Sequence, residues 1–433
     1  MTDDVLDGMD VRAVRPHGMS EAVRPGKVSV VLYSHDTFGL GHLRRNLAIA
    51  AEMLRRRDRF AVTLLTGSPV IGIWRLPPGL QVQPLPPVVK VGVESYAPRD
   101  GVGHFGMVKG YREALILKQV MTLRPDVLLV DHAPAGMNGE LLSTLSLIRR
   151  EMPATRTVLG LRDILDSPEA VRSIWESQGT HALIEEAYDD VFVYGSRSLF
   201  DIAGAYGLSS EVAKRVRYCG HVVERECDEI GESTEADFRR PCWSVERAAG
   251  RPVALVTVGG GGDGRFLVQA YLESLHRGHA AGAYSVIVLG PLMDRAEKAS
   301  LIAMARGRSD VEFVDVVVGL QWCVRAADLV ISMAGYNTCA EIVANRKKAV
   351  LVPRAAPRAE QRMRARLLAD MGLAVCVEPS AGDLAGELGD AVDAALAAPP
   401  APEALWRNLP IDGAVHVADQ VLAVAAQADG RAM

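Results

Sequence analysis

Short apolar runs alternate with longer amphipathic stretches along most of this chain. The runs KVSVVLYS, FAVTLLTG, DVLLVD, TVLGLRD and DVFVYGS have the length and the β-branched content of buried strands. The stretch between the first two runs, HLRRNLAIAAEMLRRR, has helical periodicity and a basic end that suits a helix C-terminus. Buried strands that are separated by helices predict a parallel sheet covered on both faces.

A second series of the same kind follows a change in composition. Residues 225–250 are rich in charge and give little strand signal, so we expect a linker there. Six further strand-like runs come after it: PVALVTV, YSVIVLG, VEFVDVV, DLVISM, KAVLVP and AVCVE. The pattern predicts a loose tail (1–26), a first α/β domain (27–224), the linker (225–250), a second α/β domain (251–405) and a final helical segment (406–433).

Composition narrows the functional classes. With 433 residues the chain is too long for one ordinary core, which supports two domains. Its 5% of aromatic residues and net charge of -5 disfavour a nucleic-acid partner. No apolar run approaches the roughly 18 residues that span a bilayer, and the first 26 residues contain no secretory apolar region, so we expect a cytoplasmic protein without a transmembrane segment. The six cysteines match no common zinc spacing, and no metal is expected.

The first glycine turn, HDTFGLGHLRRN, joins the first strand to its helix. Its glycines let the backbone approach a ligand, and His42 at the start of the helix is placed to act as a general base or to donate to a phosphate. A packing or capping histidine is the structural alternative. Ligands of parallel sheets bind beyond the carboxyl ends of the strands, where Asp131 and Asp163 lie, so His42, Asp131 and Asp163 are the catalytic candidates. Further candidates of this domain are His35, Asp36, Gly39, Gly41, Arg45 and His104, the last from a Gly-rich segment at residues 90–110.

The second glycine turn, VTVGGGGDGRF, follows a strand and opens a helix. Free N–H groups in such a turn can cradle a diphosphate, and Arg265 could add a charged donor. The literal GxGxxG that begins at Gly259 is also a dinucleotide fingerprint. However, the next strand ends without the expected acidic residue, and no Lys-Ser or Lys-Thr follows for an ATPase loop.

The third turn lies in MAGYNTCAEIVANRKK and is followed by VPRAAPRAEQRMRAR. Gly335 allows close approach to a phosphate, and Asn337 or Thr338 can cap the next helix. A buried Glu341 in that helix could accept two hydrogen bonds from a ribose diol, although an exposed glutamate favoured by the helix dipole is the simpler alternative. Glu360 and Gln361 begin another helix, where their side chains could bind sugar hydroxyls.

Taken together, these motifs resemble the GT-B glycosyltransferases, in the family 28-like branch that contains the GlcNAc transferase of the peptidoglycan lipid precursor. ADLVISMAGYNTCAEIVANRKKAVLVP with the EQ pair is similar to the donor-domain signature, and VGGGGDGR to the diphosphate loop. The resemblance implies two Rossmann-like domains across a cleft, a last helix that crosses back to the first domain, and no metal. It also implies a ribose role for Glu341 and a donor-sugar role for Glu360 and Gln361.

The first half departs from that branch. The turn GLGHLRRNLAIA looks more like the UDP-sugar hydrolase of pseudaminic acid synthesis, and Arg364 stands where the transferase signature has Asn. We therefore expect a metal-independent inverting transferase that uses a UDP-linked or related sugar nucleotide and an unidentified small or lipid-linked acceptor. The donor-binding candidates are Gly260, Gly261, Gly262, Arg265, Gly335, Asn337, Thr338, Glu341, Glu360 and Gln361, with Val318 and Leu320 at the base. A UDP-sugar hydrolase, a nicotinamide-dependent oxidoreductase and a non-catalytic sugar-nucleotide binder are the alternatives.

Overall fold

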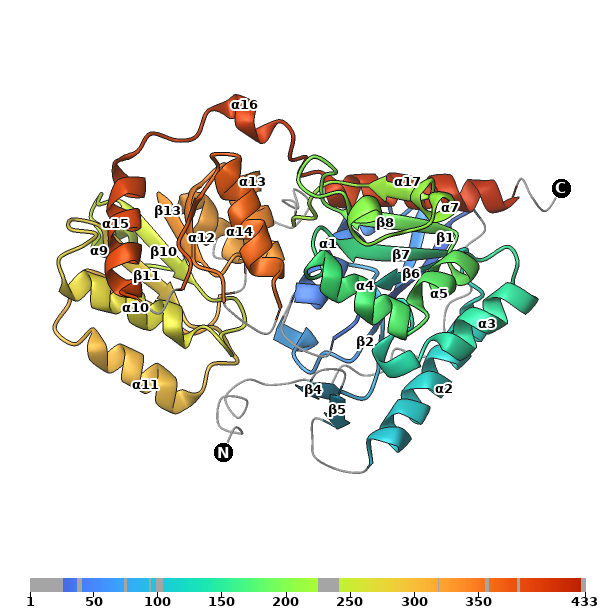
Figure 1. Ribbon diagram of the computed structural model, residues 1–433. Coiled ribbons are helices and arrows are strands. Elements are labelled where there is room, and N and C mark those ends of the chain that lie inside the picture. The colour runs from blue at the N-terminus through green and yellow to red at the C-terminus, as the bar shows by residue number, and fades with distance from the viewer. Residues whose placement is uncertain are drawn as a thin grey trace.

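Two parallel β-sheets form the centres of two lobes that lie side by side (Figure 1). The computed structural model describes residues 26–36, 41–73, 76–92, 95–98, 104–224, 241–317, 319–354, 358–379 and 382–429. Each sheet is covered by helices on both faces, so the α/β class and the pair of Rossmann-like domains predicted from the sequence are confirmed.

The sheet of the N-terminal lobe has seven parallel strands within the described residues, in the order β3-β2-β1-β6-β7-β8-β9. Alternate side chains of β1 point to opposite faces. Val30 and Leu32 pack with α1 and α17, whereas Val31 and Tyr33 pack with α2, α3, α4 and α5. The strands are β1 (Val28–Tyr33), β2 (Phe60–Thr66), β3 (Gln81–Pro84), β6 (Val127–Asp131), β7 (Arg156–Arg162), β8 (Asp190–Tyr194) and β9 (Val216–Tyr218). The helices are α1 (Gly41–Arg55), α2 (Phe105–Leu123), α3 (Leu142–Glu151), α4 (Pro168–Ser177), α5 (Thr180–Ala187), α6 (Ile202–Ala205) and α7 (Ser210–Ala213), with 3-10 turns at Ile71–Ile73 and Met137–Gly139.

The C-terminal lobe has six parallel strands within the same described ranges, in the order β12-β11-β10-β13-β14-β15. This is the strand order of a dinucleotide-binding Rossmann sheet, in which the chain reverses direction between β10 and β13. The strands are β10 (Val253–Thr257), β11 (Tyr284–Val288), β12 (Val311–Val314), β13 (Leu329–Ser332), β14 (Lys348–Leu351) and β15 (Val375–Cys376). The helices are α9 (Val245–Ala248), α10 (Arg265–His276), α11 (Arg295–Met304), α12 (Leu320–Ala326), α13 (Tyr336–Ala344), α14 (Glu360–Asp370), α15 (Leu384–Ala397) and α16 (Glu403–Trp406).

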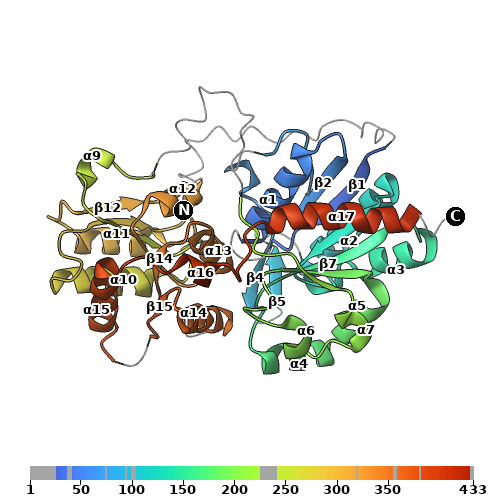
Figure 2. The ribbon, with the colours of Figure 1, turned by 90° about the horizontal axis from the view of Figure 1, so that it is seen from above.

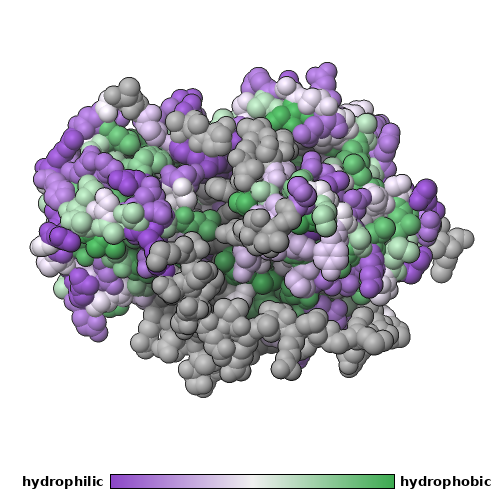
Figure 3. Space-filling view, turned by 90° about the horizontal axis from the view of Figure 1, so that it is seen from below, coloured by the Kyte–Doolittle hydropathy of each residue, from purple (hydrophilic) through white to green (hydrophobic). Residues whose placement is uncertain are grey.

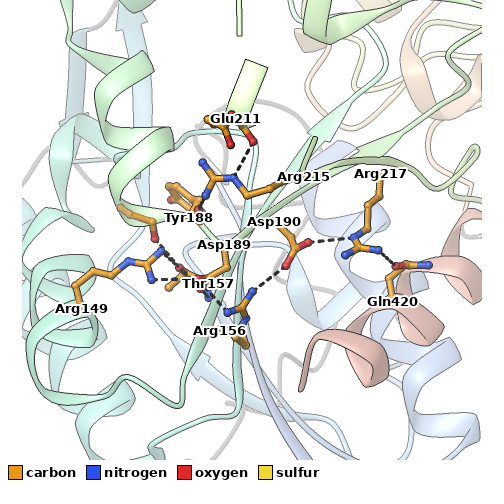
Figure 4. A network of polar contacts seen from close by, with 11 residues as sticks. Arg149, Arg156, Thr157, Tyr188, Asp189, Asp190, Glu211, Arg215, Arg217 and Gln420 are labelled. Atoms are coloured by element: carbon orange, nitrogen blue, oxygen red, sulfur yellow. Dashed lines mark hydrogen bonds and ion pairs between the residues drawn. The ribbon is translucent and has the colours of Figure 1, made fainter. Parts of the chain in front are cut away.

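The final helix, α17 (Gly413–Asp429), crosses back to the N-terminal lobe, as the family resemblance implied (Figure 2). Its buried Val417, Val421 and Val424 join the same core as α1. A polar network on β7, β8 and β9 adds an anchor, because Arg217 donates to Gln420 at 3.0 Å and to Asp190 at 3.0 Å (Figure 4). Each buried valine contributes about 1.5–3 kcal/mol, so α17 is an integral part of the N-terminal core.

Some elements were not predicted from the sequence. The weakly patterned segment at residues 90–110 contains an antiparallel hairpin, β4 (Val88–Gly92) with β5 (Ser95–Pro98), and the start of α2. The short edge strands β3 and β9 also carry little apolar signal. None of the described helices combines the length and the apolar character needed to cross a bilayer. Figure 3 shows hydrophilic residues spread over both lobes of one face, with apolar patches between them.

Candidate active site

A cavity of about 250 Å³ lies between the two lobes. Each sheet changes direction beside its first strand, between β1 and β6 and between β10 and β13. Side chains and loops that follow these strands meet at the cavity, which is where open α/β sheets bind their ligands. The N-terminal lobe contributes Gly41, His42, Arg44, Arg45, Arg162 and Glu224, and the C-terminal lobe contributes the three segments described next together with residues of the loops after β11 and β12.

The glycine loop after β10 forms one wall of this cavity. Gly261 has a φ of 91°, and a Cβ added there would lie 2.2 Å from the Leu289 carbonyl oxygen. Glycine is therefore required at this position, because any side chain would collide with the backbone of the next loop. Within the described residues, the N–H groups of Gly260 and Gly262 donate no hydrogen bond to the protein. These groups are available to phosphate oxygens, as the sequence predicts.

Replacing Gly261 with Ala should abolish nucleotide binding at concentrations that saturate the wild type. The new methyl group forces the loop away from Leu289 and so displaces the neighbouring N–H groups. Isothermal titration with UDP measures the loss. Gly278→Ala is the matched control: this glycine also has a positive φ, of 94°, but a Cβ there meets no atom within 4 Å. Equal UDP binding by Gly261→Ala and the wild type would contradict a diphosphate role for the loop.

The N-terminus of α13 points at the same cavity. Gly335 is its N-cap and lines the cavity together with Tyr336, Asn337 and Thr338. No side chain caps this end of the helix, so its first N–H groups and the positive end of the helix dipole remain available to an anion. Asn337 also donates to the Gly41 carbonyl at 3.2 Å, which joins the two lobes at the edge of the cavity.

Glu341 lies one turn further along α13 and is buried behind the lining residues. Its Oε1 accepts a hydrogen bond from Arg44 of the N-terminal lobe, and its Oε2 is buried without a partner. Burial raises the pKa of Glu341, although the charge of Arg44 opposes the shift. Glu341 itself does not line the cavity, so a ribose would reach it past Asn337 and Thr338, which precede it by four and three residues.

The start of α14 closes the cavity on another side. Glu360 and Gln361 both line it, in the place where the resemblance implies donor-sugar contacts. Arg354 donates from Nη2 to Glu360 at 3.0 Å, and its backbone N–H donates to Gln361 at 3.3 Å. Glu360 Oε2 is buried without a partner, which leaves a carboxylate oxygen available to a sugar hydroxyl.

His42 and Asp131 form the pair that faces these groups from the N-terminal lobe. His42 Nδ1 lies 2.6 Å from Asp131 Oδ2, and His42 lines the cavity. Arg45 donates twice to the other oxygen, Asp131 Oδ1, at 2.6 and 3.1 Å, and its guanidinium lies over the Tyr336 ring. When Asp131 accepts a hydrogen bond from Nδ1–H of His42, Nε2 of His42 is left as the proton acceptor.

The protonation states of this pair follow from burial and charge. Burial lowers the pKa of His42, although the Asp131 charge opposes that shift. Burial alone would raise the pKa of Asp131, but the charges of Arg45 and His42 lower it to about 2. At neutral pH the pair is therefore a neutral imidazole beside a carboxylate, which is the state of a general base.

Asp163, predicted beside His42, lies elsewhere. It accepts two hydrogen bonds from the buried Arg364 of the C-terminal lobe, at 2.7 and 2.8 Å, and does not line the cavity. The strand alternation explains this position, because Arg162 precedes Asp163 at the end of β7 and its side chain points to the cavity instead.

Other predicted residues also lie away from the cavity wall. Arg265 does not line it and instead pairs with Glu297 on α11 at 3.9 Å. His35 and Asp36 are buried behind His42, where Asp36 accepts a hydrogen bond from the Ser34 hydroxyl at 2.9 Å.

The other candidates of the first domain and of the base pocket have different positions. His104 is exposed at the start of α2. Of the remaining predicted residues, Leu320 lines the cavity, while Gly39 and Val318 lie outside the described residues.

Several residues near the site were not among the candidates. Thr257, at the end of β10, lines the cavity with a buried hydroxyl that has no partner, and Glu224 and Arg162 also line it. His132 follows Asp131 with a left-handed φ of 69°, and its ring centroid lies 4.9 Å from that of His42. A polar residue at the end of a strand or directly after it was the available signal for Thr257, Arg162 and His132.

Comparison with known protein families gives a match for the C-terminal lobe. Residues 254–408 match the glycosyltransferase family 28 C-terminal domain, which includes the glycine loop, α13 and α14. A search of curated protein sequences gave no match.

Solved structures with the same fold cover nearly the whole chain. A glycotransferase of kitacinnamycin has a TM-score of 0.59 at 17% identity, covering 93% of this chain and 100% of its own. MurG of Acinetobacter baumannii has a TM-score of 0.54 at 13% identity, covering 92% and 99%. UGT71G1 of Medicago truncatula, solved with UDP-glucose, has a TM-score of 0.60 at 10% identity, covering 92% and 98%. The chain therefore has the GT-B fold of these structures, and its residues 254–408 match the glycosyltransferase family 28 C-terminal domain, which supports a glycosyltransferase.

Proposed function

We propose that this protein transfers a sugar from a UDP-linked donor to a hydroxyl or amine acceptor, with inversion at the anomeric carbon and without a metal. The observation that carries the proposal is the position of the Asp131–His42 pair. It faces the same cavity as the uncapped N-terminus of α13 and the glycine loop after β10. One lobe thus presents a base, and the other presents donors for a diphosphate.

In this mechanism His42 Nε2 removes the proton from the acceptor as the acceptor attacks the anomeric carbon of the donor. Asp131 accepts the hydrogen bond from Nδ1–H of His42 and stabilises the imidazolium that forms, while Arg45 donates to Asp131 and keeps it in place. A single direct displacement by an acceptor on the side of His42 inverts the anomeric carbon.

The departing diphosphate gains negative charge, and the C-terminal lobe is arranged to stabilise it. The free N–H groups of the glycine loop and the first turn of α13 supply fixed positive dipoles, to which the Thr257 hydroxyl adds a donor. In this account the uracil lies near Leu320, the ribose near Glu341 and the sugar near Glu360 and Gln361.

Replacing Glu341 with Gln should raise the KM for the UDP-sugar about 10- to 100-fold with little change in kcat. The carboxylate would accept charge-assisted hydrogen bonds from the ribose, each of which contributes roughly 1.5–3 kcal/mol. Steady-state kinetics with varied donor measure the effect. Arg44→Met is the control, because it removes the ion pair but keeps the carboxylate. If Arg44→Met raised KM as much as Glu341→Gln, the ion pair rather than the ribose contact would explain the effect.

The identity of the donor nucleotide can be tested by comparing the dissociation constants of different nucleotides. We expect UDP to bind more tightly than GDP or dTDP in isothermal titration, and UDP-sugars to bind at the same site. Hydrolysis of the UDP-sugar by water activated at His42 is the alternative reaction, but the family match gives it no support. Tighter binding of NAD than of UDP would contradict the proposal and favour an oxidoreductase.

A further inference from the structure

Arg162 is the cation of the cavity that the proposed mechanism does not use. It is the last residue of β7 and lines the cavity from the N-terminal lobe. Within the described residues its guanidinium forms no hydrogen bond and no ion pair, and its Nε is buried without a partner. The other cavity arginines differ, since Arg44 pairs with Glu341, Arg45 with Asp131 and Arg354 with Glu360.

Arg162 is only partly buried as a residue, but its Nε is fully buried, and a cation that loses water without gaining a protein partner is costly, so its position needs a reason. Burial lowers the pKa of Arg162, Glu360 opposes the shift, and the charges of Arg364, Arg358 and Arg45 add to it, so that the resulting pKa is about 10. At this pKa the guanidinium is charged at neutral pH. It therefore presents a partly desolvated positive charge to the cavity, an arrangement suited to binding a carboxylate or a phosphate.

Arg162 lines the same cavity as His42 and Glu360, and its charge interacts with both. Its charge acts on His42 and His132 of the N-terminal lobe and is itself influenced by Glu360 at the start of α14. The groups available to the donor diphosphate lie in the C-terminal lobe, in the glycine loop and the first turn of α13. A ligand group that meets Arg162 therefore belongs to the sugar or the acceptor.

We infer that Arg162 binds an anionic group, a carboxylate or a phosphate, that the substrates carry beyond the donor diphosphate. This inference rests on the proposed function. The anion has two sources: a uronic acid as the transferred sugar, or a carboxylate or phosphate on the acceptor. In either case Arg162 determines substrate specificity, and a neutral sugar transferred to a neutral acceptor leaves it unpaired.

Two binding experiments on the full chain separate these sources. In the first, isothermal titration compares UDP-glucuronate with UDP-glucose. In the second, the protein is saturated with UDP and titrated with glucose 6-phosphate or with glucose. We expect the anionic probe of one experiment to bind about tenfold or more tightly than its neutral partner, and Arg162→Met to remove that preference. A preference in the first experiment assigns the anion to the donor sugar, and one in the second assigns it to the acceptor.

Control variants separate recognition from a structural role. Arg366→Met removes an exposed arginine of α14 that pairs with Glu378, and it should keep the preference. Arg162→Met should keep or raise the Tm, because it removes a partly buried charge that has no partner; a fall in Tm would identify a structural arginine and overturn the inference.

Three binding outcomes would also overturn the inference. They are no preference in either experiment, a preference that persists in Arg162→Met, and a loss of affinity for UDP itself in Arg162→Met. All three leave UDP binding to the wild type intact. Failure of the wild type to bind UDP would instead overturn the proposed function together with this inference.

Discussion

Replacing His42 with Ala should lower kcat for sugar transfer by about 10²- to 10⁴-fold, the range for loss of a positioned general base. The dissociation constant for UDP should stay nearly unchanged, because the proposed nucleotide contacts belong to the C-terminal lobe. Single-turnover transfer and isothermal titration measure the two quantities. His104→Ala is the matched control, since His104 is exposed and away from the cavity. Transfer by His42→Ala at the wild-type rate would remove His42 from the chemistry.

The dependence of the rate on pH tests the same pair independently. His42 accepts a proton only when it is neutral, and burial holds its pKa below the ordinary 6.5. The acidic limb of kcat/KM should therefore lie below pH 6.5, with the rate falling as the pH falls through the limb. The Asp131 charge raises the pKa of His42, so Asp131→Asn should move the limb to a lower pH as well as lowering the rate. A limb that stayed in place, or moved to a higher pH, would contradict the pairing.

The second large effect concerns stability rather than catalysis. Asp163→Asn should destabilise the protein by about 3–5 kcal/mol, because it leaves the buried Arg364 with an uncompensated charge between the lobes. Thermal unfolding measured by calorimetry reports the loss as a lower Tm. Glu211→Gln is the control, because its pair with Lys214 is exposed to solvent and should contribute little to stability.

The outcome for the double variant identifies the cause of that loss. Asp163→Leu combined with Arg364→Met replaces the ion pair with apolar side chains and should recover most of the stability, since paired removal leaves no buried charge. Stability should also fall in acid. The Arg364 charge lowers the pKa of Asp163 in the folded state despite burial. The ion pair therefore contributes to the free energy of unfolding at pH values above the pKa that Asp163 has in the unfolded chain. This contribution is lost as the pH falls through the lower pKa that Asp163 has in the folded protein. A wild-type Tm for Asp163→Asn would contradict this role.

The fold could be predicted from the sequence because its signals are local. Each central strand is an apolar run of strand length, and the helix predicted to follow the second glycine turn is α10, which begins directly after Gly264. The edge strands β3 and β9 were missed because they have few fully buried positions and therefore little apolar pattern. The hairpin of β4 and β5 was missed for a related reason, since its segment is rich in glycine and has no clear period.

Pairings across the two lobes could not be predicted from the sequence. Asp163 and Arg364 are 201 residues apart, and their contact depends on how two separately folded sheets meet. The carboxylate at the end of β7 therefore looked like a partner for His42, although it compensates a buried arginine of the other lobe. Arg44, whose side chain reaches Glu341 across 297 residues, is a second example.

Sugar transfer itself is tested most directly by following the fate of an isotopically labelled sugar from a panel of UDP-sugars, with and without a small-molecule extract of the source cells. We predict that one donor releases UDP only when the extract is present, that the label then appears in a new glycoside, and that His42→Ala forms neither product. Release of UDP with free labelled sugar at the same rate without the extract would contradict transfer and make the protein a hydrolase.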